Sequence, residues 1–266
     1  MTDSLPCLAV VPMYLRNEQD LDIVLRCLVS LRQTAPEVEV LVVDDCSPAA
    51  QLVDLIEIAA EELEIELCRL PVNGGFARAV NVGLRRARDA GRDALLVNAD
   101  IVFDRPGWLA PMLARTDTTG ALAGVVGARL LSPNGLLQHA GFYYSTLTRD
   151  WAHRLRFGPA DLPEALVPLS CPVTAALQLI RHECLAAVGV YDESFRMGYE
   201  DVDYCLRVFA SGRECVYEPA TCATHAEGSF RKPLPAGQEG WEEQSLLLLN
   251  TKYPITEMTG FRPCYE

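Results

Sequence analysis

Residues 38–48 read VEVLVVDDCSP, a mostly apolar run that stops abruptly at two aspartates. A short apolar run bounded by turn residues is typical of a strand buried on both faces of a sheet. Residues 7–13 (CLAVVPM) follow the same pattern, as do residues 94–100 (ALLVNAD), which again end on an acid. We therefore expect three buried strands that belong to one sheet.

Segments with helical periodicity separate these strands. Leucines recur at helical spacing over residues 21–31, behind the polar opening NEQD, and a second helix is expected over roughly residues 49–63. Residues 64–70 (EIELCRL) are predicted to form another strand, and residues 73–91 a glycine turn that leads into a helix. This alternation with short connections predicts an α/β fold whose mostly parallel central sheet is covered on both faces.

The carboxyl ends of the strands are where we expect a ligand, because parallel sheets bind ligands at that edge. The residues at these positions are Pro12 and Tyr14 after the first strand, Asp44 and Asp45 after the second, and Asn98 and Asp100 after the fourth. Acids at two of four strand ends are more than chance would often provide. The first hundred residues are therefore predicted to form a nucleotide-binding half.

The second half is centred on residues 197–210 (MGYEDVDYCLRVFA), where a polar loop meets a helix-like run. Glu200 and Asp201 lie at that junction, and His225 follows 24 residues after Asp201. Carboxylates at a helix start can be simple capping groups, because they meet unpaired N–H groups and the positive end of the helix dipole. Asp100 with a distant histidine also suits a divalent cation, Mg²⁺ or Mn²⁺.

Composition and charge exclude several classes of protein. The formal net charge of −13 argues against a nucleic-acid partner, which would need a basic surface, and no apolar stretch approaches the ~18 residues of a membrane span. The N-terminus lacks a basic n-region, so we expect a first strand rather than a signal peptide. None of the ten cysteines forms a C-x-x-C pair, which favours reduced thiols and a cytoplasmic location, or a peripheral one at the inner membrane face. The oligomeric state is left open.

Five segments of the chain resemble, in order and spacing, the family 2 inverting glycosyltransferases of GT-A fold, and the rhamnosyltransferase-like and galactofuranosyltransferase-like branch is the most similar. The segments are residues 10–31, 38–48, 73–84, 95–103 and 188–230. The resemblance implies a GT-A domain over residues 1–230, with a nucleotide-sugar-binding half (1–103) and an acceptor and catalytic half (104–230). Residues 231–266 would be a tail with one closing helix.

The resemblance also implies roles for individual residues. Asp201 falls on the general base, with Glu200 beside it, while Asp100 and His225 fall on positions that hold Mn²⁺ or Mg²⁺. The predicted donor-binding residues, from the strand ends and the resemblance together, are Pro12, Tyr14, Asp44, Asp45, Asn73, Gly75, Arg78, Asn98 and Ala99. One position departs from the family pattern, because Asn98 stands where the D-x-D motif has its first aspartate.

The stretch between about residues 138 and 170 has aromatic and basic side chains but little periodicity, as expected of a binding loop. Aromatic rings suit the apolar faces of sugars, and arginine suits a phosphate or carboxylate. The predicted acceptor-binding residues are Tyr144, Trp151, His153 and Arg156. An irregular loop with some buried aromatic side chains is the competing interpretation.

The predicted function is hexosyl or deoxyhexosyl transfer from a UDP-, dTDP- or GDP-sugar to the hydroxyl of a saccharide, lipid-linked or small-molecule acceptor. Direct displacement, with a carboxylate taking the proton of the acceptor, would invert the anomeric centre. One alternative is a nucleotidyltransferase that makes sugar nucleotides, although the segment after the first strand has no glycine-rich loop. The other is a non-catalytic nucleotide-sugar-binding protein, which Asn98 favours.

Overall fold

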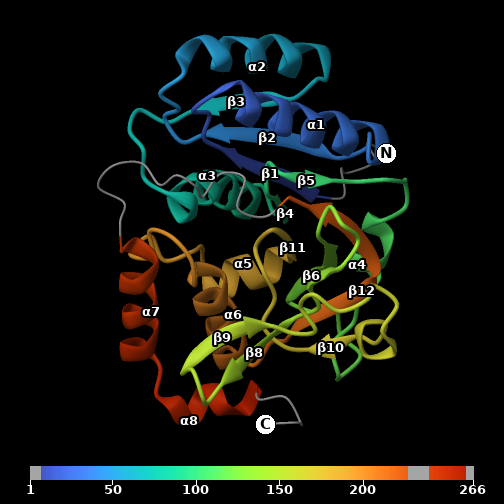
Figure 1. Ribbon diagram of the computed structural model, residues 1–266, viewed down its shortest axis with the longest axis vertical. Helices are drawn as coiled ribbons and strands as arrows, with labels where there is room; N and C mark the ends of the chain where they lie inside the picture. The colour runs from blue at the N-terminus through green and yellow to red at the C-terminus, as the bar shows by residue number, and fades with distance from the viewer. Residues whose placement is uncertain (1–6, 227–239, 262–266) are drawn as a thin grey trace.

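The structure, a computed structural model, describes residues 7–226 and 240–261 (Figure 1). These residues form an α/β fold around a mixed sheet of ten strands. The main path has the order β10-β12-β6-β11-β4-β1-β2-β3, with β5 paired to β12 and β7 paired to β6. These strands are β1 (Cys7–Met13), β2 (Glu39–Asp44), β3 (Glu66–Arg69), β4 (Asp93–Val97), β5 (Ile101–Val102), β6 (Val125–Leu131), β7 (Leu137–His139), β10 (Leu169–Ser170), β11 (Leu177–Ile180) and β12 (Cys215–His225).

The first half of the chain forms the predicted parallel sheet, since β3, β2, β1 and β4 run parallel to one another. Neighbouring residues of β1 face opposite sides, so that Val11 packs into the core on one face and Val10 into the core on the other. Full burial of such a side chain contributes about 1.5–3 kcal/mol. Burial on both faces explains why the strands are apolar without alternation.

Helices cover both faces of the sheet (Figure 1). One face packs against α1 (Glu18–Thr34) and α2 (Ala50–Glu62), the other against α3 (Phe76–Asp89), α5 (His182–Val188) and α6 (Glu200–Ala210). The remaining helices are α4 (Leu109–Ala114), α7 (Trp241–Lys252) and α8 (Ile255–Met258), with 3₁₀ turns at Pro163–Ala165 and Thr259–Phe261. The expected α/β architecture is confirmed.

The two halves of the chain share one sheet. Strand β11 is antiparallel to both of its neighbours, β4 of the first half and β6 of the second. The stretch expected to be a binding loop contains β7, β10 and a separate two-stranded sheet of β8 (Phe142–Ser145) and β9 (Asp150–His153). Its short strands alternate too briefly to give a periodic pattern, which is why sequence reasoning missed them.

The closing helix expected in the tail is α7, which lies beside α6 (Figure 1). A completely buried carboxylate, Asp203 of α6, holds it there. Asp203 accepts hydrogen bonds from Lys252 Nζ at 2.5 Å, from Tyr253 Oη at 2.9 Å and from Arg207 Nε at 2.9 Å. The rest of the predicted tail, residues 231–239 and 262–266, lies outside the described residues.

The described part of the chain contains nine cysteines, all of them free thiols. Burial raises the pKa of Cys7 to about 12 and that of Cys184 to about 11, so these thiols stay protonated and unreactive at neutral pH. Within the same residues, no helix has both the length and the apolar character needed to cross a membrane.

Candidate active site

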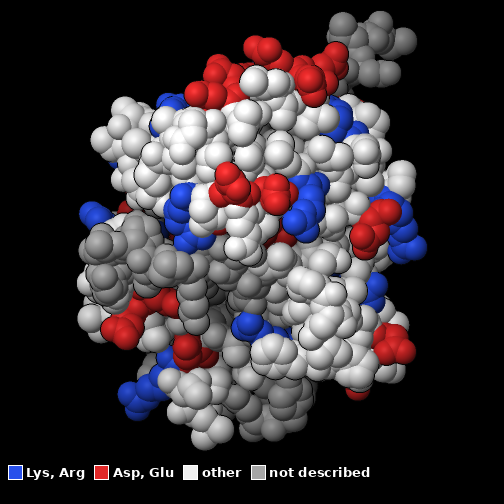
Figure 2. Space-filling model, turned by 45° about the horizontal axis from the view of Figure 1, so that its top comes forward, with Lys and Arg blue, Asp and Glu red and all other residues white. Residues whose placement is uncertain are grey.

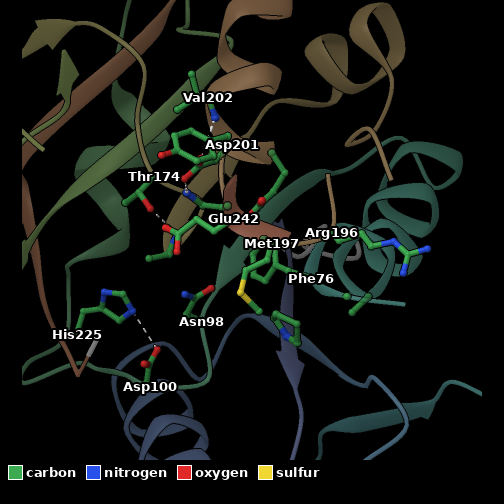
Figure 3. Close-up of a pocket in the computed structure, with 18 of the residues that line it drawn as sticks. Phe76, Asn98, Asp100, Thr174, Arg196, Met197, Asp201, Val202, His225 and Glu242 are labelled. Atoms are coloured by element: carbon green, nitrogen blue, oxygen red, sulfur yellow. Dashed lines mark hydrogen bonds and ion pairs between the residues drawn. The ribbon is translucent and has the colours of Figure 1, made fainter. Parts of the chain in front are cut away.

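A cavity of about 450 Å³ lies where the carboxyl ends of β1 and β4 meet the second half of the chain. One wall comes from residues after β1, β2 and β4 and from the turn before α3. The opposite wall comes from β8–β9, the loop 174–176, the start of α6, the end of β12 and the first turn of α7. Figure 3 shows Asp201 and Glu242 on one side of this cavity and Asn98 and Asp100 on the other.

Most of the predicted site residues line this cavity. They are Pro12, Tyr14, Asp45, Asn73, Gly75, Asn98, Ala99, Asp100, Trp151, His153, Arg156, Glu200, Asp201 and His225. Segments as far apart in sequence as residues 12 and 225 therefore meet at one place, as the resemblance implied.

Three predicted residues lie away from the cavity wall formed by the described residues. Asp44 is completely buried beneath it, where the carboxylate accepts from Ser47 and pairs with Arg69 Nε at 3.1 Å. Tyr144 is also completely buried and packs edge-on against Trp151. Arg78 lies on α3 outside the lining. Asp44 and Tyr144 thus support the residues of the wall instead of facing a ligand.

Asp45 is held by the glycine turn that precedes α3. Its two carboxylate oxygens accept from the backbone N–H groups of Gly74 and Gly75, both at 2.8 Å, and its carbonyl accepts from Asn73 Nδ2 at 3.1 Å. Burial raises the pKa of the Asp45 carboxyl from 3.8 to about 6, although both N–H donors oppose this shift. Asp45 is therefore a hydrogen-bond acceptor whose charge changes near neutral pH.

The turn also brings the two halves of the chain into contact. Gly75 has a φ of +84°, and a Cβ atom there would lie 2.7 Å from the carbonyl oxygen of Arg196. A side chain would meet both backbone strain and a direct clash. The glycine predicted here as part of the donor site thus also permits close packing of the backbone across the cavity.

Gln138 fixes the orientation of His225. The Gln138 amide nitrogen donates to the His225 carbonyl at 3.2 Å, so its amide oxygen must face His225 Nδ1, which lies 2.6 Å away. Nδ1 therefore carries a proton. In the neutral ring, Nε2 then holds a lone pair that faces Asp100 Oδ1 at 3.0 Å. Two lone pairs at this distance repel each other unless a proton or a cation lies between them.

The donor atoms around this pair fit a divalent cation. A carboxylate oxygen and an imidazole nitrogen are available, and the neighbouring Asn98 Oδ1 is buried and has no hydrogen-bond partner among the described residues. Within the described ranges, no group of three or more His, Cys, Asp or Glu side chains gathers to hold a metal ion. A cation at Asp100 and His225 would therefore need oxygens from a bound ligand to complete its coordination.

Asp201 occupies the first turn of α6 and is 9 % exposed. Its Oδ2 accepts from Ala175 N–H at 3.1 Å and its Oδ1 from Val202 N–H at 2.8 Å. The same loop fixes the opposite wall, because the Ala176 carbonyl accepts from Asn98 N–H at 2.8 Å. The loop 174–176 therefore sets the positions of Asp201 and of the Asn98 backbone together.

Sequence reasoning missed several residues of the wall. Gln138 is one, and the first turn of α7 adds Trp241 and Glu242. The Arg196 guanidinium lies 5.3 Å from the centre of the Trp241 ring, in a cation–π contact. The sequence has a tryptophan followed by two acids at the start of this helix. This pattern could have indicated a binding residue, but it is equally typical of a helix with acidic residues in its first turn.

The cavity is acidic. Among the described residues that line it, six carry carboxylates and two carry guanidinium groups. A further acidic surface lies elsewhere, since Figure 2 shows acidic side chains gathered at the upper edge over α2, whose exposed acids are Asp54, Glu57, Glu61 and Glu62. An anionic ligand in the cavity would be repelled by the six carboxylates of the described lining unless a cation bound with it.

Two solved structures have a fold similar to that of this chain. GalNAc-T7 with UDP, GalNAc and Mn²⁺ aligns with a TM-score of 0.63 and 17% identity over 84% of this chain and 44% of that one. The mannosyltransferase PcManGT from Pyrobaculum calidifontis, in complex with GDP-Man and Mn²⁺, aligns with a TM-score of 0.58 and 17% identity over 85% of this chain and 58% of that one. At these identities the likeness concerns the fold, and it confirms the expected GT-A fold.

Two curated relatives match across most of this chain. An uncharacterized protein, y4gI of Sinorhizobium fredii, is 30% identical over 73% of this chain and 22% of its own length. The O-antigen biosynthesis protein RfbC of Myxococcus xanthus is 29% identical over 78% of this chain and 16% of its own length. The chain thus spans less than a quarter of the length of either relative.

The model of one protein family, glycosyl transferase family 2, matches residues 9–160. This segment is more than half of the 266 residues, and it contains β2, β3, β4, most of β1 and the hairpin β8–β9. The rhamnosyl or galactofuranosyl branch expected from the resemblance stays a prediction. The chain belongs to glycosyl transferase family 2.

Proposed function

We propose that this chain transfers a sugar from a nucleoside-diphosphate sugar to an acceptor hydroxyl, with inversion and with Asp201 as the general base. One observation carries the proposal. The same cavity is lined by a pair suited to a divalent cation, Asp100 and His225, and by a hydrogen-bonded carboxylate, Asp201, at the start of α6. In this assignment residues 1–103 bind the donor, and residues 104–230 supply the base and bind the acceptor.

The donor would lie against the first wall of the cavity. Asp45 can accept from the base or ribose hydroxyls of a nucleotide, and Asp100 and His225 would hold Mn²⁺ or Mg²⁺ beside the diphosphate. When bound, the cation would neutralise the charge that develops on the departing nucleoside diphosphate. The acidic cavity supports the need for a cation, because its described lining has six carboxylates and two guanidinium groups.

The acceptor would lie on the side of Asp201. As the acceptor oxygen bonds to the anomeric carbon and the bond to the diphosphate breaks, Asp201 would take the proton of the hydroxyl. The N–H groups of Ala175 and Val202 fix the carboxylate in place. Trp151, His153 and Arg156 are the proposed contacts to a saccharide, lipid-linked or small-molecule acceptor. We also propose a reducing compartment, the cytoplasm, as the location of the chain, because the nine described cysteines are free thiols.

A non-catalytic nucleotide-sugar-binding protein is the second candidate, and Asn98 is the observation that favours it. An amide in place of the first D-x-D carboxylate removes one negative charge beside the cation. Its buried Oδ1, which has no partner in the part of the chain that the structure describes, can still accept from a ribose hydroxyl or bind the cation.

The substitution Asp201→Asn separates the two candidates. We expect the rate of nucleoside-diphosphate release from the donor sugar, with water or a supplied acceptor, to fall about 10²–10⁴-fold, because the amide cannot take the proton. Calorimetry should give the same Kd for the nucleoside diphosphate in both proteins. Equal rates in the variant and the wild type would show that Asp201 is not the base. Tight donor binding without turnover in the wild type would favour the binding protein.

A thermal-shift panel identifies the nucleotide. UDP, GDP, dTDP and CMP are each added with Mn²⁺ and with EDTA. A ligand at 100 times its Kd stabilises the folded state by about 2.7 kcal/mol, and we expect a rise in Tm with one nucleoside diphosphate in the presence of Mn²⁺. A rise of equal size in EDTA would contradict the role of the cation.

A further inference from the structure

A buried hydrogen-bonded network lies behind the loop 174–176, and the proposed chemistry does not use it. At its centre is Gln178, a completely buried polar side chain on β11. Its Nε2 donates to the Val173 carbonyl at 3.1 Å, and its Oε1 accepts from the Tyr191 hydroxyl at 2.7 Å. A buried amide costs free energy unless it is hydrogen-bonded, and here both of its ends have a partner. The side chain therefore links the loop to the segment before α6.

Tyr191 determines which end of the amide faces the loop. Burial, reinforced by the negative charge of Asp201, raises the pKa of Tyr191 well above its usual value, so the hydroxyl keeps its proton and donates. The backbone of Tyr191 is held by Asn81 of α3, which accepts from its N–H at 2.9 Å and donates to its carbonyl at 2.9 Å. The amide oxygen of Gln178 therefore faces Tyr191, and the amide nitrogen faces Val173.

Val173 is closely packed at the start of the loop. Gln178 lies opposite Gly127 of β6, and a Cβ atom on Gly127 would lie 2.4 Å from the Val173 Cβ. The Val173 side chain thus occupies the space that a larger residue at position 127 would need. Cys205 Sγ lies 3.5 Å from both the backbone nitrogen and the carbonyl oxygen of Val173. Because a thiol is a weak donor, the Gln178 amide is the main support of this carbonyl.

The next links of the loop reach the carboxylate of Asp201. Two residues after Val173, the backbone N–H of Ala175 donates to Asp201 Oδ2 at 3.1 Å. A displacement of Val173 would change the geometry of this hydrogen bond, since a single residue separates it from Ala175. The N–H favours the charged form of the carboxylate and fixes its orientation. Direct contacts thus connect Tyr191, through Gln178, to the proposed base.

We propose that Gln178 is a positioning residue that holds the carboxylate of Asp201 in place. It acts through Val173 and the N–H of Ala175, and Tyr191 sets the orientation of its amide. The importance of this position for catalysis rests on the proposed role of Asp201 as general base, whereas the hydrogen-bonded path does not. Neither Gln178 nor Tyr191 is among the described residues that line the cavity, so each acts through the loop.

The position of the loop can be measured at the Ala175 amide. The dipeptide Thr–Ala occurs twice in the chain, ending at Ala35 and at Ala175. Labelling threonine with ¹³C at the carbonyl and alanine with ¹⁵N therefore selects these two amides. Ala35 lies at the end of α1, away from the described lining of the cavity, and its signal is the internal reference. In Gln178→Met the loop loses its support, and we expect the Ala175 ¹H signal to move upfield as its hydrogen bond to Asp201 weakens.

Tyr191→Phe and Tyr204→Phe form a matched pair of variants. Both rings are buried and lie against each other with centroids 4.9 Å apart, but the Tyr204 hydroxyl donates to the Gly189 carbonyl at 3.1 Å instead of to the network. We expect Tyr191→Phe to move the Ala175 signal upfield by less than Gln178→Met does, and Tyr204→Phe to leave it in place. If Gln178→Met does not fold, Tyr191→Phe decides the outcome. An unmoved signal in either variant, or equal movement in Tyr204→Phe, would overturn the positioning role.

Rates of nucleoside-diphosphate release show whether this position matters for transfer. We expect Gln178→Met to lower kcat about 10- to 100-fold, because a misplacement of about 1 Å can cost about 100-fold. In the Asp201→Asn background the same change should lower kcat by less than about 2-fold, since no base remains to be positioned. Equal losses in both backgrounds would overturn action through Asp201. If Asp201→Asn alone leaves the rate unchanged while the Ala175 signal responds as expected, the general base is refuted and the hydrogen-bonded path stands.

Discussion

The two walls of the cavity are built in different ways. The proposed donor wall consists of strand ends and one turn, and its residues follow directly from the parallel sheet: Asp45 follows β2, and Asn98 and Asp100 follow β4. The acceptor wall is assembled from the hairpin β8–β9, the start of α6, the end of β12 and α7. Local sequence sets the first wall, whereas contacts between distant segments set the second. Each prediction below either breaks a contact between the walls or changes one wall alone.

The largest effect should come from Gln138, a residue of the second half that supports the cation pair. Gln138→Leu removes the acceptor that fixes His225 Nδ1–H, which frees the ring to rotate or change tautomer. Loss of such a supporting hydrogen bond typically weakens metal binding about 10–100-fold. Calorimetric titration of Mn²⁺ in the presence of the nucleoside diphosphate measures the change. His182→Asn, away from the cavity, is the control, and an unchanged Mn²⁺ affinity in Gln138→Leu would contradict the positioning of His225.

A change of pH should affect the donor wall through Asp45. Because its pKa is raised to about 6, the carboxyl takes up a proton as the pH falls below 6 and becomes a weaker acceptor for the hydroxyl groups of the nucleotide. If the charged form alone binds, the Kd at pH 5 should be about 10-fold higher than at pH 7. The nucleotide phosphate titrates in the same range, so Asp45→Asn is the reference. Parallel pH profiles for both proteins would exclude Asp45 as the titrating group.

A smaller effect should follow from Gly75→Ala, which tests the packing between the two halves. The new methyl group would meet the Arg196 carbonyl in addition to the strain of a positive φ. Gly135→Ala provides the matched control, because Gly135 has a φ of +82° and nothing within 4 Å of its Cβ position. We expect Gly75→Ala to be less stable than the control by about 1 kcal/mol, or roughly 2–4 °C in Tm. Equal Tm values would indicate that the backbone around Arg196 shifts to accept the methyl group without loss of stability.

The same contrast explains what could be predicted from sequence. Runs such as VEVLVV predicted the strands correctly, because burial on both faces leaves a clear apolar pattern. The acids that follow these runs predicted the position of the proposed donor wall. Asp44 could not be distinguished from Asp45 by sequence, since which of two neighbours turns inward depends on Ser47 and Arg69. The role of Asp201 as general base was predicted from the resemblance to the family.

The supporting residues carry no local signal. Gln138 and His139 form part of a strand of three residues, and each contacts a histidine far away in sequence or across a hairpin. Trp241 and Glu242 reach the cavity because Asp203 holds the far end of α7. Such roles arise from tertiary contacts, which a pattern of residue types along the chain does not encode.

The continuous sheet also limits how the cavity can open. Because β11 is hydrogen-bonded along one edge to β4 and along the other to β6, the two halves cannot swing apart about a hinge without breaking a core ladder. Ladders of this kind open at close to the full cost of unfolding, whereas elements outside the sheet open more cheaply. Entry of the donor and departure of the nucleotide would therefore use small movements of the separate hairpin β8–β9 and of α7, which line the cavity and stand outside the main sheet. We therefore expect movement on the proposed acceptor side of the cavity and a rigid wall on the proposed donor side.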